Sequence, residues 1–319
     1  MGVFDFLFGN QAPVHVAQKF EPVHDGRFHL VEARRGRGKS YGMTYWQYAW
    51  LCDMLPGILD GSKPHSKAIS NFAIDHHRLA LLLCVDGHMP DLDSALDLVH
   101  ERVIYASTWE PFLLSYESGL FLDECNRSLD AYQTKRTPLS ALVHDFHQQT
   151  RKHKNTLVYA TQYVDWINTQ TRKLFDLLWR AKVIRDKVRR GPDGLGVPLR
   201  FNYYGSDPYG NGVDAQVVRR ADFKMQLPFD LQVARLYRSW EAIVTFPGDQ
   251  ELPWASFQEL SNYMLAAGLK PAPTPPRPDW LQLYRDLDAE HAQRQRASVD
   301  GRERARPARD RDRLAAGVV

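Results

Sequence analysis

The chain has 319 residues, of which 44% are hydrophobic and 25% are charged, and its net charge is +3. This is long enough for one large soluble domain with an appendage. Three cysteines at distant positions give no disulfide framework and no metal-ligand spacing, which suits a reducing cytoplasm.

The apolar residues at the chain start should form a strand or helix that packs on the body, or alternatively an interfacial membrane anchor. Residues 1–10 are apolar, but Asp5 interrupts them and no basic residues precede them, unlike a secretory signal. No window reaches 18 uncharged apolar residues, so we predict no transmembrane segment.

The positive charge is concentrated near the C-terminus. Residues 291–319 contain eight arginines and four acidic residues, which leaves the rest of the chain near neutral. A general nucleic-acid coat is therefore not predicted, and DNA contact would have to come from local patches or from this tail.

In chain order, residues 1–27 form a lead-in, and the apolar run 28–32 predicts a short strand. The next residues fit a phosphate-binding loop, with Ala33 at the position where glycine is usual, and a helix follows from Ser40 to about Leu55. Pro56 and Gly57 should end this helix.

The loop composition suits phosphate binding. Glycines allow the tight turn that points backbone N–H groups and a helix N-terminus at phosphates, while lysine can reach the β- and γ-phosphates and serine can ligate Mg²⁺. An accidental glycine-rich turn is the alternative. The predicted nucleotide-binding residues are Arg34, Arg35, Gly36, Arg37, Gly38, Lys39, Ser40 and Tyr41.

An acid pair follows a later apolar run. We expect strands at 67–72 and 103–106, and helices from Asp75 to about residue 84 and over 91–102. The run 119–122 then ends in Asp123 and Glu124, as a buried central strand does when its carboxyl end brings acids to a site. The alternative is a helix N-cap at Asp123.

The remaining core elements continue this alternation. Thr137 and Pro138 should open a helix that ends near residue 154, followed by a strand over 156–162, a helix over 164–179 and a strand over 181–184. Alternating strands and helices over 28–190 predict an α/β fold with a mostly parallel sheet and helices on both faces. The phosphate loop, the acid pair and Gln162 then share one edge of the sheet.

The sequence changes character after this core. A turn-rich basic loop from residue 185 and short β-like stretches at 199–204, 213–218 and 241–246 predict a small β extension over 191–270, with a helix over 257–267. A proline-rich linker follows over 271–279. Residues 280–319 should form a weak helix and a disordered arginine-rich tail.

These parts suggest ATP and Mg²⁺ as cofactors. Lys39 and Ser40 would hold the nucleotide and metal, Asp123 would support the metal, and Glu124 would activate water. Gln162, at the end of the neighbouring strand, would sense the γ-phosphate.

The ordered motifs resemble the assembly ATPases of filamentous phages, the zonula occludens toxin-like (Zot) group in the FtsK/HerA branch. The resemblance covers about residues 28–190, and the runs that carry it are 119–126, 135–138, the basic pair 151–152, Gln162 and 170–172. It implies a RecA-like ASCE P-loop fold and ATP hydrolysis between subunits of a ring, with a hexamer favoured. It also implies movement of viral DNA, bound without sequence preference.

The chain departs from that group after the ATPase region. Members generally carry a transmembrane helix there, whereas this chain has a proline linker and an arginine-rich tail. We therefore expect a protein of the host cytoplasm, peripheral at the inner membrane or within the virion, that docks on a membrane or capsid protein.

A ring ATPase also needs an arginine from a neighbouring subunit. We favour Arg151, with Arg136 second and Arg127 and Arg172 as further candidates; each could equally be a solvated surface arginine. DNA-contact candidates are basic residues on one segment that could line a ring pore or simply form an exposed face: Arg180, Lys182, Arg185, Lys187, Arg189 and Arg190.

The predicted function is therefore an ATP-driven motor for phage DNA packaging or for virion assembly and extrusion. The alternatives are a HerA-like or conjugation-type DNA translocase, and a nucleotide-gated assembly scaffold with slow hydrolysis.

Overall fold

The computed structural model describes the chain in six segments. They are residues 27–129, 137–190, 196–206, 223–237, 243–246 and 250–271. Contacts divide the chain into units Met1–Lys270 and Pro271–Val319, and the fold described below belongs to the first. The expected strand at 213–218, the proline linker beyond Pro271 and the arginine-rich tail lie outside the described residues.

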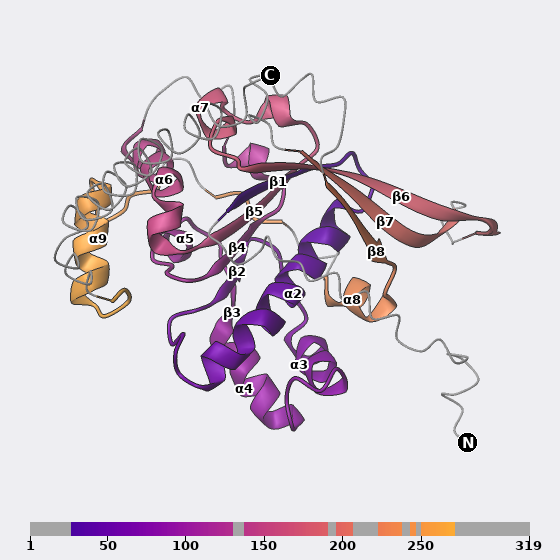
Figure 1. Ribbon diagram of the computed structural model, residues 1–319. Helices are drawn as coiled ribbons and strands as arrows, with labels where there is room; N and C mark the ends of the chain where they lie inside the picture. Colours follow the sequence, from indigo (N-terminus) through magenta and orange to yellow (C-terminus); the bar gives the residue numbers. More distant parts are fainter. Residues whose placement is uncertain are drawn as a thin grey trace, which may run out of the picture. The chain divides into compact units, whose positions relative to one another are not determined.

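One sheet of eight strands in the order β3-β2-β4-β5-β1-β6-β7-β8 forms the centre of the described fold (Figure 1). Its parallel strands are β1 (Phe28–Glu32), β2 (Ala68–Ser70), β3 (Val103–Tyr105), β4 (Gly119–Leu122), β5 (Thr156–Thr161) and β6 (Leu177–Arg190). β7 (Gly196–Ser206) and β8 (Phe223–Pro228) continue the sheet antiparallel from β6. The predicted mostly parallel α/β sheet is confirmed.

Residue alternation along the buried strands creates two cores. Phe121 and Val158 face one core with α2 (Lys39–Leu59), α3 (His76–Val85), α4 (Leu92–Arg102) and α8 (Leu231–Leu236). Leu120 and Leu157 face the other, with α5 (Glu110–Leu113), α6 (Pro138–Gln148) and α9 (Phe257–Ala266). Strands buried on both faces explain the continuous apolar runs in the sequence.

Two expected helices differ from the structure. α2 runs on through Pro56 to Leu59, because Leu55 and Ile58 remain buried in the core and only one backbone donor is missing near the helix end. The helix expected over 164–179 is wrong. A 3₁₀ turn, η4 (Val164–Trp166), and α7 (Thr169–Arg172) occupy its first half, and Leu177 to Trp179 pair with β1 as the start of β6.

The basic segment is also more regular than expected. Residues 185–190 continue β6 rather than forming a loop, because they pair with β7 across a register shift. The helix expected to end near residue 154 is instead α6, followed by a second 3₁₀ turn, η3 (Thr150–His153). Residues 243–246 form no strand. No helix of the described residues is long and apolar enough to span a membrane.

Candidate nucleotide site

The loop between β1 and α2 has the backbone that the phosphate-loop prediction requires. Gly36 has a φ of 72° and Gly38, at the helix N-cap, has a φ of 96°. Residues with side chains rarely adopt these angles, so glycine is needed at both positions. The loop leads directly into α2, whose first backbone N–H groups have no acceptor within the helix.

Lys39 joins this loop to the acid pair at the end of β4. Its Nζ lies 2.6 Å from Asp123 Oδ1 and also forms an ion pair with Glu124 Oε1. Burial lowers the pKa of Lys39, but the charges and hydrogen bonds of Asp123 and Glu124 outweigh it, so the pKa is raised overall. The ammonium is therefore charged throughout the physiological pH range.

Glu124 is held in an unusual backbone conformation. Its φ of 48° and ψ of 42° are left-handed, although it is not glycine. Its N–H donates to Asp123 Oδ1 at 2.8 Å, and Gln162 Nε2 donates to its Oε1 at 3.3 Å. Strained residues persist where the surroundings determine them, commonly at functional sites. The structure thus brings Lys39, Glu124 and Gln162 together, as the sequence predicted.

The oxygen atoms here suit a magnesium ion. Ser40 Oγ donates to Asp123 Oδ2 at 3.2 Å, so a hydroxyl and a carboxylate converge beside the phosphate loop. Mg²⁺ is usually bound by one or two protein oxygens together with water and substrate phosphates. In the described segments, no group of three or more His, Cys, Asp or Glu side chains could hold a metal ion.

Asn71, which the sequence analysis did not single out, organises the acid pair. Its Oδ1 accepts from Asp123 N at 2.7 Å, and its Nδ2 donates to Asp123 O and Val244 O, both at 2.9 Å. Asn71 follows β2, the neighbour of β4, and is buried. Its position at a strand's carboxyl end was the same signal that identified Gln162.

Tyr237 is a second residue that sequence reasoning missed. Burial and the Asp123 carboxylate raise the pKa of its hydroxyl, while a hydrogen bond with Ser40 acts in the opposite direction. Its ring packs 5.6 Å from that of Phe72, and a bridge to Ile74 holds its backbone. Nothing in the local sequence placed this tyrosine near the loop.

The side chains of the other predicted loop residues lie outside the cluster around Lys39. Arg34, Arg35 and Arg37 are exposed, and Arg34 lies over the Tyr163 ring at 5.8 Å. Arg34 and Arg37 line a groove of about 430 Å³ together with Gln162 and Arg180. The Tyr41 hydroxyl turns away, donating to Pro228 O at 2.7 Å and accepting from Asp230 N at 3.0 Å. Only its backbone stays at the loop.

Arg151, the favoured candidate to act between subunits, lies away from this site within one chain. Arg151 Nη2 pairs with Asp176 Oδ1 at 2.8 Å near the start of β1, at the opposite edge of the sheet. Its side chain is 75% exposed. Arg127 is also exposed, and Arg172 pairs with Asp165 at 2.8 Å. Arg136 lies outside the described residues.

The DNA-contact candidates all lie on β6. Lys187, Arg189 and Arg190 are exposed, and Arg189 Nε pairs with Asp186 Oδ2 at 2.8 Å. Arg185 instead donates from Nη1 to Gly196 O at 2.8 Å and from Nη2 to Gly36 O at 3.3 Å. One member of this basic set therefore contacts the phosphate loop directly.

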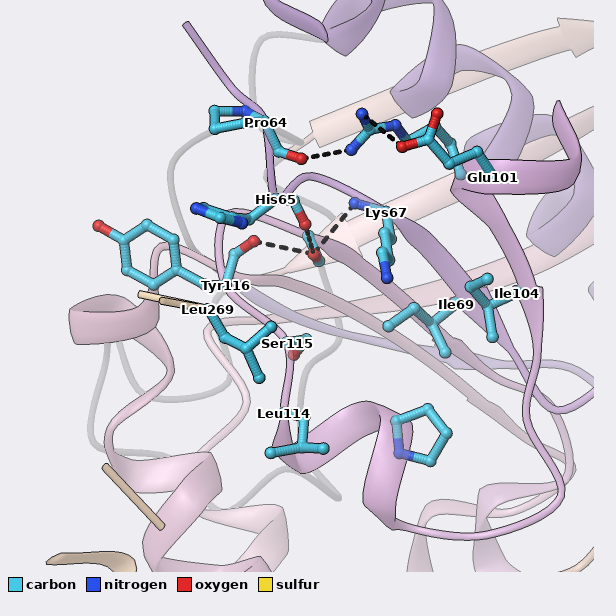
Figure 2. A pocket seen from close by; sticks show the side chains of 13 residues that line it. Pro64, His65, Lys67, Ile69, Glu101, Ile104, Leu114, Ser115, Tyr116 and Leu269 are labelled. Carbon is cyan, nitrogen blue, oxygen red and sulfur yellow. Dashed lines mark hydrogen bonds and ion pairs between the residues drawn. The ribbon is translucent and has the colours of Figure 1, made fainter. Parts of the chain in front are cut away.

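A separate pocket of about 340 Å³ lies at the amino ends of β2 and β4 (Figure 2). Lys67 and Tyr116 line it beside Ile69 and Leu114, and the Ser118 hydroxyl ties its wall by accepting from Lys67 N at 3.1 Å. Because Asn71 and Asp123 follow the same strands, this pocket is at the opposite end of the sheet from Lys39.

Comparison with known proteins places the chain among distant structural neighbours. No protein-family model matches it, and no curated protein matches it. It is similar to the N-terminal domain of zonular occludens toxin from Neisseria meningitidis, with 13% identity and a TM-score of 0.35 over 66% of this chain and 98% of that chain. It is also similar to the genome packaging NTPase B204 from Sulfolobus turreted icosahedral virus 2, with 14% identity and a TM-score of 0.33 over 65% and 99%.

A third neighbour is the DNA-packaging ATPase B204 from Sulfolobus turreted icosahedral virus, with 16% identity and a TM-score of 0.34 over 65% of this chain and 100% of that chain. At these identities and TM-scores, the similarities assign no activity to this chain.

Proposed function

We propose that this chain is a Mg²⁺-dependent ATP hydrolase that drives viral DNA packaging or virion assembly and extrusion. The observation that carries the proposal is the bonding of Lys39 to both Asp123 and Glu124. It joins a glycine loop at a helix N-terminus to two carboxylates within one small site. Phosphoryl transfer needs this combination of phosphate positioning and charge neutralisation.

The acids and the lysine would exchange partners when nucleotide binds. The Lys39 ammonium would move from carboxylate to phosphate oxygens, since both are anionic acceptors within reach of a flexible side chain. The Ser40 hydroxyl and the Asp123 carboxylate would hold Mg²⁺, which supplies positive charge to the phosphates. Glu124 would then be free to accept a proton from water that Gln162 helps to position.

The biological setting of this proposal comes from the sequence resemblance to phage assembly ATPases. We infer that the chain forms a ring, with a hexamer favoured, in which Arg151 of one subunit completes the site of its neighbour. Viral DNA would contact the exposed cations of β6 through its phosphates, and a membrane or capsid protein would anchor the ring through residues 1–27 or the arginine-rich tail.

ATP turnover by the purified full-length chain tests this function. With Mg²⁺ we expect turnover that DNA stimulates, and a larger mass in solution when a non-hydrolysable ATP analogue is bound. Lys39→Ala should abolish nucleotide binding, whereas Lys173→Ala, which removes an exposed lysine, should not.

The other outcomes separate the rival functions. Tight ATP binding with negligible turnover, even with DNA and partner present, would favour a nucleotide-gated scaffold. ATP binding that Lys39→Ala leaves unchanged would refute the proposed site. DNA-stimulated turnover by a chain that binds no capsid or phage membrane protein would instead favour a HerA-like or conjugation-type translocase.

A further inference from the structure

The outer side of the phosphate loop is packed against β7. A Cβ added at Gly38 would lie 2.1 Å from the Phe201 ring, and one added at Gly42 would lie 2.4 Å from the Tyr203 hydroxyl. Both distances are far shorter than side chains allow. A Cβ added at Gly36 would meet no other atom within 4 Å, so only the backbone angle requires glycine there. The loop and the first turn of α2 therefore rest directly on two aromatic residues of β7.

Two side chains of the β6–β7 hairpin also bond to carbonyls of the loop. Tyr203 donates to Gly38 O at 2.8 Å, and Arg185 donates to Gly36 O at 3.3 Å. Tyr203 is fully buried, and Arg185 is anchored by its second bond to Gly196 O. The hairpin is thus bonded to two peptide groups of the loop. The bonded residues are 149 positions apart in one contact and 165 in the other.

These bonds determine where loop N–H groups point. In a planar trans peptide the C=O and the following N–H point in opposite directions. Gly38 O accepts from Tyr203 and also from Gly42 N at 2.9 Å, so both bonds direct the N–H of Lys39 away from β7, toward the space in front of the helix N-terminus. The peptide after Gly36 is held at both ends, because Arg37 N donates to Arg34 O at 3.2 Å.

We propose that Arg185 and Tyr203 are positioning residues for the phosphate loop, through which the β6–β7 hairpin prepares the loop for a nucleotide's phosphate chain. This rests on the proposed nucleotide site. Because Lys187 and Arg189 are exposed on the same strand, a polyanion bound there acts on the loop through Arg185. Such coupling is reciprocal, so nucleotide also changes the affinity of the hairpin for the polyanion.

The test compares binding of ATP, ADP and adenosine by the full-length chain and its variants. Arg185→Gln and Tyr203→Phe should each weaken ATP and ADP binding about fivefold, as expected for removal of one hydrogen bond. Adenosine binding should not change, because it has no phosphates. KM for ATP should rise while kcat stays within about twofold, and DNA should no longer stimulate turnover of Arg185→Gln.

Matched controls separate positioning from general damage. Arg200→Gln removes an exposed arginine from β7, and Tyr204→Phe removes the hydroxyl next in sequence to Tyr203. Neither should change ATP binding. Arg185→Lys, which keeps a donor, should recover part of the affinity, and all variants should retain the wild-type melting temperature within about 3 °C.

The outcomes distinguish this inference from the proposed function. If the wild-type chain binds no ATP, the nucleotide site itself is wrong. If it binds ATP and Arg185→Gln binds equally tightly with intact DNA stimulation, only the positioning role is overturned. A uniform decrease in affinity for ATP, ADP and adenosine would also overturn it, because it would show a structural defect rather than phosphate positioning.

Discussion

Asn71 holds the peptide groups on both sides of Asp123, accepting from its N–H at 2.7 Å and donating to its C=O at 2.9 Å. A third bond ties the same amide to Val244 O. The acid pair is thus aligned by a neighbouring strand rather than by its own. All three bonds are buried or partly buried, and all three are lost when this side chain is removed.

Asn71→Ala should therefore destabilise the chain and misplace the acids. Leaving a buried partner unsatisfied costs about 1–3 kcal/mol, and three partners lose a bond here, so we expect the free energy of unfolding to fall by at least about 3 kcal/mol. Urea denaturation measures this change. Asn262→Ala, at an exposed site on α9, should cost less than about 1 kcal/mol. Equal destabilisation of the two variants would contradict the role of Asn71.

Glu124→Gln should bind ATP but fail to hydrolyse it. The amide keeps the shape of the side chain but cannot accept a proton from water, and general base catalysis typically contributes 10²–10⁴-fold. We expect kcat to fall at least about 100-fold while ATP affinity stays within about threefold. Glu110→Gln, an exposed glutamate on α5, should keep full turnover. Full turnover in Glu124→Gln would show that Glu124 is not the general base.

Arg151→Ala should be inactive alone yet well folded. The pair with Asp176 is exposed, and such pairs contribute only about 0–1 kcal/mol to stability. Mixing Arg151→Ala with Glu124→Gln subunits should restore turnover, because one interface then combines an intact glutamate with a neighbour's arginine. Arg78→Ala, which breaks the exposed pair with Asp75, should remain active by itself. Mixed rings without recovered turnover would count against action between subunits.

His147 should make stability depend on pH below neutrality. Burial lowers its pKa to about 3, and burial likewise lowers the pKa of His153 to about 4. Between pH 6.5 and these values the unfolded chain binds protons that the native chain does not. Each histidine therefore reduces stability by about 1.4 kcal/mol for each unit by which the pH falls in this range.

His147→Gln should flatten this dependence. Urea denaturation at pH 6.5 and 5 should give a difference in unfolding free energy about 2 kcal/mol smaller than in the wild-type chain, whatever the variant's stability at neutral pH. His88→Gln, which changes an exposed histidine outside the helix of His147, should keep the wild-type difference. An unchanged difference in His147→Gln would show that this ring is protonated in the native chain.

The exposed cations of β6 should bind DNA through its phosphates. Lys187→Gln combined with Arg190→Gln should weaken binding to all DNA sequences alike. The slope of log K against log salt should become shallower by about 0.9 for each phosphate of double-stranded DNA that the variant no longer neutralises. Lys152→Gln combined with Lys173→Gln removes the same charge elsewhere and should leave the slope unchanged. Equal effects of the two pairs would indicate general attraction rather than a defined surface.

The sequence predicted those residues of the candidate site whose polar side chains directly follow a buried strand. Asp123, Glu124 and Gln162 come directly after buried apolar runs, and parallel strands bring such ends to one edge. Asn71 occupies an equivalent position after β2, but the expected strand over 67–72 included it, whereas β2 ends at Ser70. Tyr237 had no such signal, because its place depends on contacts with Phe72 and Ile74.

Local sequence patterns were enough to predict the phosphate loop, the acid pair and the alternation that builds a parallel sheet, because these depend on backbone freedom and on apolar periodicity. The packing of the β6–β7 hairpin against the phosphate loop depends instead on tertiary contacts. Trp179 became part of a strand through the long-range pairing of β6 with β1. The same pairing brings Arg185, Phe201 and Tyr203 of the β6–β7 hairpin to the loop. Such contacts join residues about 150 positions apart, so no local pattern encodes them.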